Sequence, residues 1–279
     1  MPIQPKAKYG VIGNPVGHSR SPLIHRAFAE QTGIALEYTA ILAPLDGFVS
    51  AVSQFRIAGG RGLNVTVPFK AEAFALCQKR SERAQRAGAV NTLIFPADVR
   101  GDVFGDNTDG VGLLRDLAFH HIPLQGKKIL LLGAGGASRG VLAPLLAEHP
   151  ACLLIANRRE KTATALTADF IDLAHNTQLQ ACALNDIPAE PFDLIINATS
   201  ASLSDEHLPL PDSLIATNTV VYDMAYGNQP TIFMQWASAH GARAIDGLGM
   251  LVEQAAESFY LWHGVRPETQ TVRPILRCR

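Results

Sequence analysis

The chain has 279 residues, of which 47% are hydrophobic and 18% are charged, so it can bury a sizeable core and is not intrinsically disordered. Its formal net charge is −1 and no long basic run occurs, which speaks against nucleic-acid and anionic-membrane partners. The cysteines are scattered without a Cys-x-x-Cys pair, and no apolar stretch resembles a signal core or a membrane span. We therefore expect a soluble cytoplasmic protein of one large or two medium domains.

Predicted strands and helices alternate in the first part of the chain. We expect strands at 8–13, 36–41 and 62–66, and helices at 22–31, 45–58 and 70–78. Ser21 is expected to cap the first helix, with Pro22 at its first position and Gly33 at its end. This alternation predicts a parallel sheet with helical crossovers.

Turn-forming and capping residues are dense just before a second helical segment. A strand is expected at 88–95, and a turn with an edge strand at 98–105. Thr108 is expected to cap a helix over 109–120, because apolar residues recur there at helical spacing. We expect this helix to link two domains.

The most informative stretch is a glycine turn between an apolar run, 129–132, and a helical pattern that resumes after Ser138. Gly133 can adopt the positive φ of the turn, and Gly135 and Gly136 allow close approach of a ligand. The helix N-terminus would attract a phosphate. Since Ser138 stands where G-x-G-x-x-G has its third glycine, a plain strand-to-helix turn remains the alternative.

The next predicted strand indicates which dinucleotide is bound. It covers 152–156 and is followed by Asn157, Arg158 and Arg159, at the point where a dinucleotide fold meets the adenosine ribose. Guanidinium groups match a 2′-phosphate, so NADP is favoured over NAD, with a solvated basic turn as the alternative. A third apolar run, 192–196, ends at Asn197-Ala198-Thr199-Ser200, which should also face the cofactor.

Hydride transfer to a nicotinamide requires orientation, water exclusion and a group that exchanges a proton. Lys70 and Asp109 are the candidates, because a lysine at a positive helix end can release a proton and a carboxylate can hold it in place. Both residues could instead be surface charges, and Asp109 could serve the helix dipole. His18 is a further candidate base, although a lone histidine in a turn is more often structural.

Several segments together resemble the shikimate dehydrogenase family. They are Gly13-Asn14-Pro15, His18-Ser19-Arg20-Ser21-Pro22, 64–70, 88–92, 107–110, 133–138, Asn157-Arg158, 197–200, and 246–250 with Gln254. The resemblance covers almost the whole chain and implies a two-domain α/β enzyme that reduces 3-dehydroshikimate to shikimate with NADPH in chorismate and aromatic amino-acid biosynthesis. It implies a substrate-binding domain at 1–108, completed by 247–279 with a returning C-terminal helix, and a Rossmann-like doubly wound NADP-binding domain at 109–246.

The resemblance also implies roles for individual residues, with Lys70 and Asp109 as the catalytic pair. Substrate contacts are implied for Ser19, Ser21, Thr66, Asn91, Tyr226 and Gln254, the two serines at the carboxylate. Cofactor contacts are implied for Gly133, Ala134, Gly135, Gly136, Ala137, Ser138, Asn157, Arg158, Arg159, Thr199, Met224 and Gly247, and no metal is implied. The family commonly has threonine and then, three positions further, arginine after Asn157-Arg158, where this chain has Arg159 and Thr162, so Arg159 or Lys161 could make the second phosphate contact.

Two other functions stay open. An NAD-using quinate/shikimate dehydrogenase is disfavoured by Arg158 and Arg159, and a non-catalytic ligand sensor is disfavoured because Lys70 and Asp109 are present and no effector domain is expected. The sequence leaves open the oligomeric state, with a homodimer as one candidate, as well as quinate tolerance, domain closure, and which of Lys70 and Asp109 holds the proton at rest.

Overall fold

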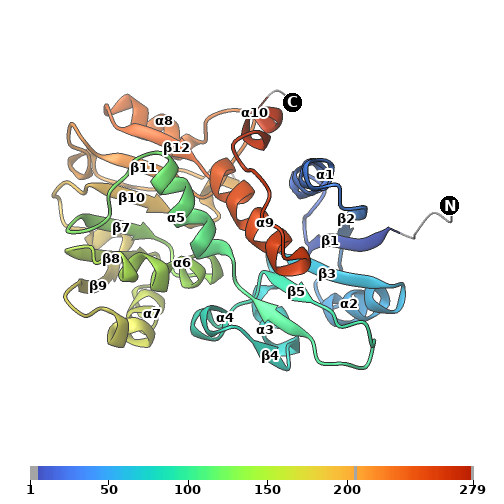
Figure 1. Ribbon diagram of the computed structural model, residues 1–279. Helices are drawn as coiled ribbons and strands as arrows, with labels where there is room; N and C mark the ends of the chain where they lie inside the picture. Colours follow the sequence, from blue (N-terminus) through green and yellow to red (C-terminus); the bar gives the residue numbers. More distant parts are fainter. Residues whose placement is uncertain (1–5, 204–205, 278–279) are drawn as a thin grey trace. The chain divides into compact units, whose positions relative to one another are not determined.

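The computed structural model describes residues 6–203 and 206–277. The chain separates into two compact units, one formed by Met1–Gly112 with Leu251–Arg279 and the other by Leu113–Met250 (Figure 1). Two helices, α5 (Asp109–Phe119) and α9 (Leu248–His263), each begin in one unit and end in the other. The chain therefore passes between the units inside regular helices rather than in loops.

The first unit contains a six-stranded mixed sheet in the order β2-β1-β3-β5-β6-β4. Its strands are β1 (Ala7–Gly13), β2 (Leu36–Leu42), β3 (Gly60–Val65), β4 (Lys79–Arg80), β5 (Thr92–Ile94) and β6 (Phe104–Asp106). β1 pairs in parallel with β2 and β3 as predicted, but β5 is antiparallel to both β3 and β6. The prediction of a parallel sheet is therefore right for β1, β2 and β3 and wrong for β5, and the segment that joins β5 to β6 is too short to carry the crossover helix that a parallel pair needs. The predicted edge strand is also wrong, because β6 lies between β5 and β4.

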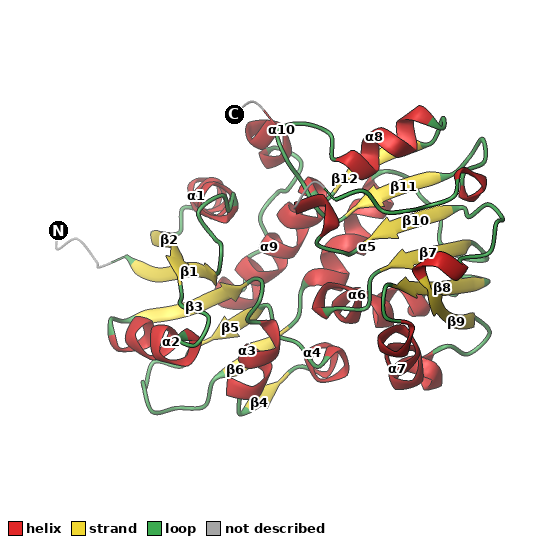
Figure 2. Cartoon of the chain, turned by 180° about the vertical axis from the view of Figure 1, so that it is seen from behind, coloured by secondary structure: helices red, strands yellow, loops and turns green. Residues whose placement is uncertain are grey.

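The helices of this unit, besides parts of α5 and α9, are α1 (Ser21–Thr32), α2 (Phe48–Ile57), α3 (Lys70–Leu76), α4 (Glu82–Ala87) and α10 (Val272–Arg277). Trp262 of α9 donates to the Leu93 carbonyl of β5, and α10 packs on α1. On one face, Phe48 of α2 and Ala73 of α3 pack with strand residues such as Leu63, and Figure 2 shows α2 and α3 along that side. Elsewhere in the unit, Phe28 of α1 packs against Phe259 of α9. These contacts place the start of α3, with Lys70, on a well-packed base.

The termini of α1 only partly follow the prediction. Gly33 ends the helix in the left-handed conformation, with φ 69°. The predicted cap at Ser21 is wrong, because Ser21 is already helical and Arg20 occupies the cap position without a side-chain bond to the helix. Ser21 is thereby left free for contacts outside its own helix.

The second unit contains a six-stranded sheet, all parallel, in the order β12-β11-β10-β7-β8-β9. Its strands are β7 (Lys128–Leu132), β8 (Cys152–Asn157), β9 (Gln178–Ala183), β10 (Leu194–Asn197), β11 (Val220–Asp223) and β12 (Arg243–Asp246). This is the strand order of the doubly wound dinucleotide fold, so the predicted Rossmann-like architecture is confirmed. The order reverses between β7 and β10, which is where such folds bind their ligands.

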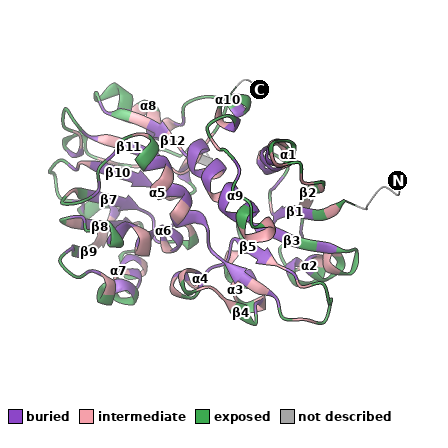
Figure 3. Ribbon diagram, viewed as in Figure 1, coloured by how far each residue is buried: buried purple, intermediate pink, exposed green. Residues whose placement is uncertain are grey.

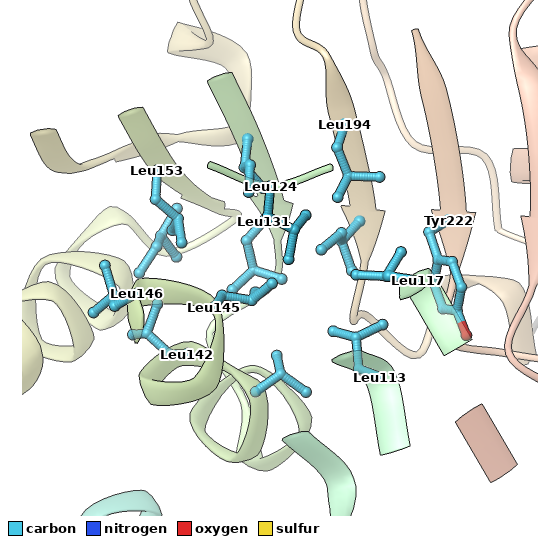
Figure 4. Close-up of a cluster of buried hydrophobic side chains, with 14 of the residues drawn as sticks. Leu113, Leu117, Leu124, Leu131, Leu142, Leu145, Leu146, Leu153, Leu194 and Tyr222 are labelled. Carbon is cyan, nitrogen blue, oxygen red and sulfur yellow. The ribbon is translucent and has the colours of Figure 1, made fainter. Parts of the chain in front are cut away.

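Helices lie on both faces of this sheet and bury its strands. Leu131 and Leu194 point to the face covered by α5, α6 (Gly136–Ala147) and α7 (Glu160–Phe170), where they meet Leu117 and Leu145 (Figure 4). Residues one position along each strand point to the opposite face, covered by α8 (Ile232–Ala239). The strands are therefore buried on both sides (Figure 3), which explains their uninterrupted apolar sequences.

Short 3-10 helices complete the second unit, at Ile171–Leu173, Leu184–Asp186, Ala201–Leu203 and Asp212–Leu214. In the part of the chain that the structure describes, no helix combines the length and apolarity needed to cross a membrane.

Candidate active site

In the first unit, Lys70 and Asp109 meet at the first residues of two helices, α3 and α5. The Nζ atom of Lys70 lies 2.5 Å from Oδ2 of Asp109, and the two side chains are 18% and 7% exposed. This burial does not fit two ordinary solvated surface charges. The remaining exposure of Lys70 is enough for its ammonium to reach a small ligand. The alternative base, His18, is an exposed residue in a turn.

Neutral side chains hold the Asp109 carboxylate from the other side. The amide of Asn91 donates to Oδ1 of Asp109 at 2.8 Å, and also approaches Thr108 Oγ1 at 3.0 Å and Gln254 Oε1 at 3.4 Å. Thr108 directly precedes α5 and its carbonyl accepts from the Gly112 amide at 3.0 Å, as expected of the residue that starts the helix. Its hydroxyl donates to Asn91 Oδ1 at 3.2 Å, and Asn107 Oδ1 accepts from the Asp109 amide at 3.1 Å. Asp109 is thus fixed at its backbone and at both carboxylate oxygens.

A buried chain of hydrogen bonds continues from Asn91 toward Ser21. Thr92 donates to Asn91 at 2.9 Å, Asn64 donates to Thr92 at 3.3 Å, and the Tyr38 hydroxyl donates to Asn64 at 2.7 Å. Burial raises the pKa of Tyr38 well above its ordinary value, and a hydrogen bond with Ser21 acts in the opposite direction. The network therefore joins a predicted substrate serine to the predicted catalytic pair.

Some members of this network have no assigned role in the sequence prediction. Asn64 also donates to Ser258 of α9 at 2.9 Å, and Ser258 is completely buried. Asn64 belongs to a segment that carries the family resemblance, which was the only available signal. Ser258 lies within an apolar helical pattern and gives none.

The remaining predicted substrate residues of this unit lie around the same segments. Ser19 Oγ accepts from the Ser21 amide at 3.3 Å. Thr66 is half-buried, and its methyl group fills the space above Gly13, where a Cβ atom would approach it to 2.3 Å. A side chain at Gly13 would therefore displace Thr66.

In the second unit, the glycine turn after β7 has the geometry of an anion site. Gly133 has φ 99°, and a Cβ atom on it would lie 3.0 Å from the Thr199 methyl group. Gly135 and Gly136 face open space, and the first-turn amides of α6 have no intrahelical acceptors. Ser138 is completely buried and donates to the Gly133 carbonyl at 2.8 Å, so it stabilises the turn in place of a third glycine.

The end of β8 presents two guanidinium groups. Asn157 donates to the Arg159 carbonyl at 3.0 Å, which shapes the turn. Arg158 lies 3.4 Å from Glu206, and the two side chains are 75% and 52% exposed. Arg159 is also exposed, so both cations are available to a ligand.

A buried carboxylate organises the ends of β10 and β11. Asp223 is completely buried and accepts from the hydroxyls of Ser202 and Thr231, both at 2.6 Å, from Asn197 at 3.2 Å and from the Ala225 amide at 3.1 Å. Burial raises the pKa of Asp223, and the hydrogen bonds only partly offset this effect. Nothing in the sequence pattern singled out this residue.

This cluster positions three predicted cofactor residues. Asn197 Oδ1 accepts from both the amide and the hydroxyl of Thr199, at 3.0 and 2.7 Å, and the Met224 amide donates to the Asn197 carbonyl at 2.9 Å. A Cβ atom on Gly247 would lie 2.2 Å from the Met224 carbonyl oxygen, so only glycine fits there. Tyr226 follows β11 and is half-buried.

An anion-binding glycine turn on a doubly wound sheet, together with a buried Lys–Asp pair in a separate unit, defines a two-domain α/β protein that binds a dinucleotide. Comparison with known proteins gives the family. Residues 11–93 match the shikimate dehydrogenase substrate binding domain, 116–205 match shikimate / quinate 5-dehydrogenase, and 247–277 match the shikimate 5'-dehydrogenase C-terminal domain.

Individual relatives agree over nearly the whole length. Shikimate dehydrogenase (NADP(+)) of Aromatoleum aromaticum is 57% identical, covering 97% of this chain and 96% of that protein. The Thermus thermophilus shikimate 5-dehydrogenase in complex with NADP(H) and shikimate is 34% identical with a TM-score of 0.86, covering 98% and 99% of the two chains. An Ael1 enzyme from Pseudomonas putida is 46% identical with a TM-score of 0.88, covering 97% and 98%. The chain belongs to the shikimate dehydrogenase family, and the resemblance inferred from its motifs is confirmed.

Proposed function

We propose that this chain is an NADP-dependent shikimate dehydrogenase, EC 1.1.1.25, which reversibly reduces 3-dehydroshikimate to shikimate in aromatic amino-acid biosynthesis. The observation that carries this proposal is the Lys70–Asp109 pair within a hydrogen-bonded group that includes Asn91 and Gln254. The names of relatives such as the Aromatoleum enzyme support the substrate and the cofactor. A biosynthetic reaction of this kind suits the cytoplasm.

The catalytic pair would handle the proton, while bound NADPH supplies the hydride. In reduction, the Lys70 ammonium donates a proton to the oxygen that becomes the alcohol, and in oxidation its neutral amine accepts that proton. Asp109 orients the ammonium and accepts from a substrate hydroxyl. Because Asn91 holds the second oxygen of Asp109, the carboxylate keeps its direction while the proton moves.

The substrate is a small polyol acid, and the proposed contacts suit it. Ser19 and Ser21 would bind its carboxylate. Thr66, Asn91 and Gln254 would bind its ring hydroxyls, and Tyr226 completes the proposed set. A substrate that leaves such groups without a hydrogen bond is rejected strongly, because unmet bonds in a buried site are costly.

The residues of the second unit fit NADP. Open space beyond Gly135 and Gly136 at the α6 N-terminus suits the pyrophosphate, and the exposed cations Arg158 and Arg159 suit the 2′-phosphate. The glycine turn with Ala134, Ala137 and Ser138, and the strand-end residues Asn157, Thr199, Met224 and Gly247, complete the proposed contacts. We accordingly assign the substrate to 1–108 with 247–279 and the cofactor to 109–246.

Steady-state kinetics with shikimate and quinate, each against NADP⁺ and NAD⁺, test this function. We expect kcat/KM to be highest for shikimate with NADP⁺. A higher value with NAD⁺ would favour the quinate/shikimate alternative. Binding of shikimate without turnover by either cofactor would refute the enzyme and favour a ligand sensor.

A further inference from the structure

A buried ion network lies directly ahead of Asp109 in the first unit. Arg83 of α4 contacts Asp106 with two nitrogens, Nε to Oδ1 at 2.7 Å and Nη2 to Oδ2 at 2.9 Å. The same Nη2 lies 3.2 Å from Glu257 of α9, whose other oxygen accepts from Arg266 at 2.7 Å. The Asp106 and Glu257 side chains are only 4% and 9% exposed, so their charges depend on these guanidinium groups.

Asp106 connects this ion network to the residues that hold Asp109. Its Oδ1 accepts from the Ser81 hydroxyl at 2.5 Å and from the Asn107 amide at 2.6 Å. Asn107 in turn accepts from the Asp109 amide, and the Asp106 carbonyl accepts from the Asn91 amide at 3.0 Å. Arg83 therefore supports, through Asp106, two residues that fix Asp109: Asn91 at its carboxylate and Asn107 at its backbone amide.

The Arg83 charge is itself well supported. Burial alone would lower the pKa of the guanidinium, but hydrogen bonds and charges from Asp106 and Glu257 raise it above its ordinary value. The planar fork also matches the carboxylate of Asp106 in a way that a lysine ammonium does not.

We infer that Arg83 is a positioning residue for the proposed dehydrogenase reaction. It fixes the segment that presents Asp109 to Lys70, and it balances the negative charges of Asp106 and Glu257, both of which it contacts. This role presupposes the proposed function and adds to it a residue that touches neither the substrate nor the cofactor.

Because Arg83 is a cation and Glu257 an anion, neutralising them should shift the pH dependence of the reaction in opposite directions. The charged groups of this region are Lys70 on α3, Arg83 on α4, Asp106 on β6, Asp109 on α5, Glu257 on α9 and Arg266 after α9. Removing the cation of Arg83 favours the protonated form of the Lys70–Asp109 pair, and removing the anion of Glu257 favours the deprotonated form. Since shikimate oxidation requires the deprotonated form, the pH of half-maximal rate should rise in the first case and fall in the second, by about half a pH unit each.

The experiment compares Arg83→Gln, Arg83→Lys and Glu257→Gln with the wild type. The single-turnover rate of NADPH formation from shikimate is measured against pH. Arg83→Gln should be at least about tenfold slower and shifted to higher pH, and Glu257→Gln should be shifted to lower pH. Arg83→Lys should keep the wild-type midpoint but remain slower, because it retains the charge and loses the fork. Lys79→Gln is the matched control, since the Lys79–Asp102 pair is 69% and 52% exposed, and it should match the wild type.

Shifts of opposite sign in the pH of half-maximal rate of Arg83→Gln and Glu257→Gln support the role of Arg83. Shifts of the same sign, or no shift in either variant, overturn it, because a merely structural residue would change stability and rate without changing this pH in opposite directions. If Arg83→Gln does not fold, Arg83→Lys decides the positioning role, because a single-turnover rate equal to that of the wild type would overturn it. Failure of the wild type to oxidise shikimate is a different result, which would refute the proposed function itself.

Discussion

A single methyl group at Gly249, in the first turn of α9, should destabilise the second unit. A Cβ atom there would lie 1.9 Å from Oδ1 and 2.5 Å from Oδ2 of Asp116, whereas ordinary contacts begin near 3.4 Å. Asp116 is completely buried and accepts from the equally buried Tyr222 hydroxyl at 2.6 Å. His120 lies on its other side, 3.7 Å from Oδ1. The carboxylate therefore has little room to move without breaking its bond to Tyr222.

Two effects of Gly249→Ala oppose each other, and their magnitudes decide the sign. Replacing a helical glycine by alanine stabilises a helix by about 1 kcal/mol. Breaking a buried hydrogen bond to a charged group, and leaving the phenol without a partner, costs about 3–5 kcal/mol in total. We expect a net loss of about 2–4 kcal/mol in the free energy of unfolding.

Urea denaturation, followed by far-ultraviolet circular dichroism, measures this loss. The matched background is Asp116→Ala, which removes the group that Gly249 approaches. In that background Gly249→Ala should be neutral or stabilising, because only the helix propensity remains. An equal loss in both backgrounds, or no loss in the wild type, would refute the proposed steric cause.

Three further predictions concern the proposed catalytic pair, the cofactor corner and the aromatic core. Lys70→Ala should lower kcat by about a hundredfold or more while changing KM for shikimate far less, and a raised KM with unchanged kcat would limit Lys70 to binding. Arg158→Ala should raise KM for NADP⁺ and spare NAD⁺, whereas equal losses with both cofactors would argue against a 2′-phosphate contact. Burial is the main cause that lowers the pKa of His25 from 6.5 to about 3, so this residue contributes stability that is present above pH 6.5 and is lost as the pH falls toward 3. His25→Phe, which can keep the stack on Tyr38, should make unfolding less acid-dependent in this range, and an unchanged pH profile would contradict that account.

The sequence predicts best those features that local chemistry determines. The apolar runs of β7, β8 and β10 and the turn at Gly133 are recognisable because each needs only its own residues to form. The direction of β5 depends on which strands it meets, and one of them, β3, is separated from it in the chain by two helices. The side-chain contacts of Thr108 at the start of α5 likewise depend on Asn91, which belongs to another segment and donates to the Thr108 hydroxyl.

The buried aspartates differ in how far their roles could be predicted from the sequence. Asp223 and Asp116 are stabilised by hydroxyl donors, which occur throughout the sequence and identify no pairing. Asp106 and Asp109 have cationic partners, Arg83 and Lys70, but even these lie more than twenty residues away in the chain. Only the family resemblance could connect such residues before the fold was known.

The partner of each carboxylate also decides what that carboxylate can do. A guanidinium stays charged throughout the range in which proteins remain folded, so the Arg83–Asp106 pair can hold a segment but cannot exchange a proton. A hydroxyl donor fixes Asp223 without supplying a second charge. An ammonium can give up its proton, and the Lys70–Asp109 pair is partly open to ligands. Among these carboxylate pairs, the one that combines a proton that can be transferred with access from outside is therefore Lys70–Asp109, while the other carboxylates keep their surroundings fixed.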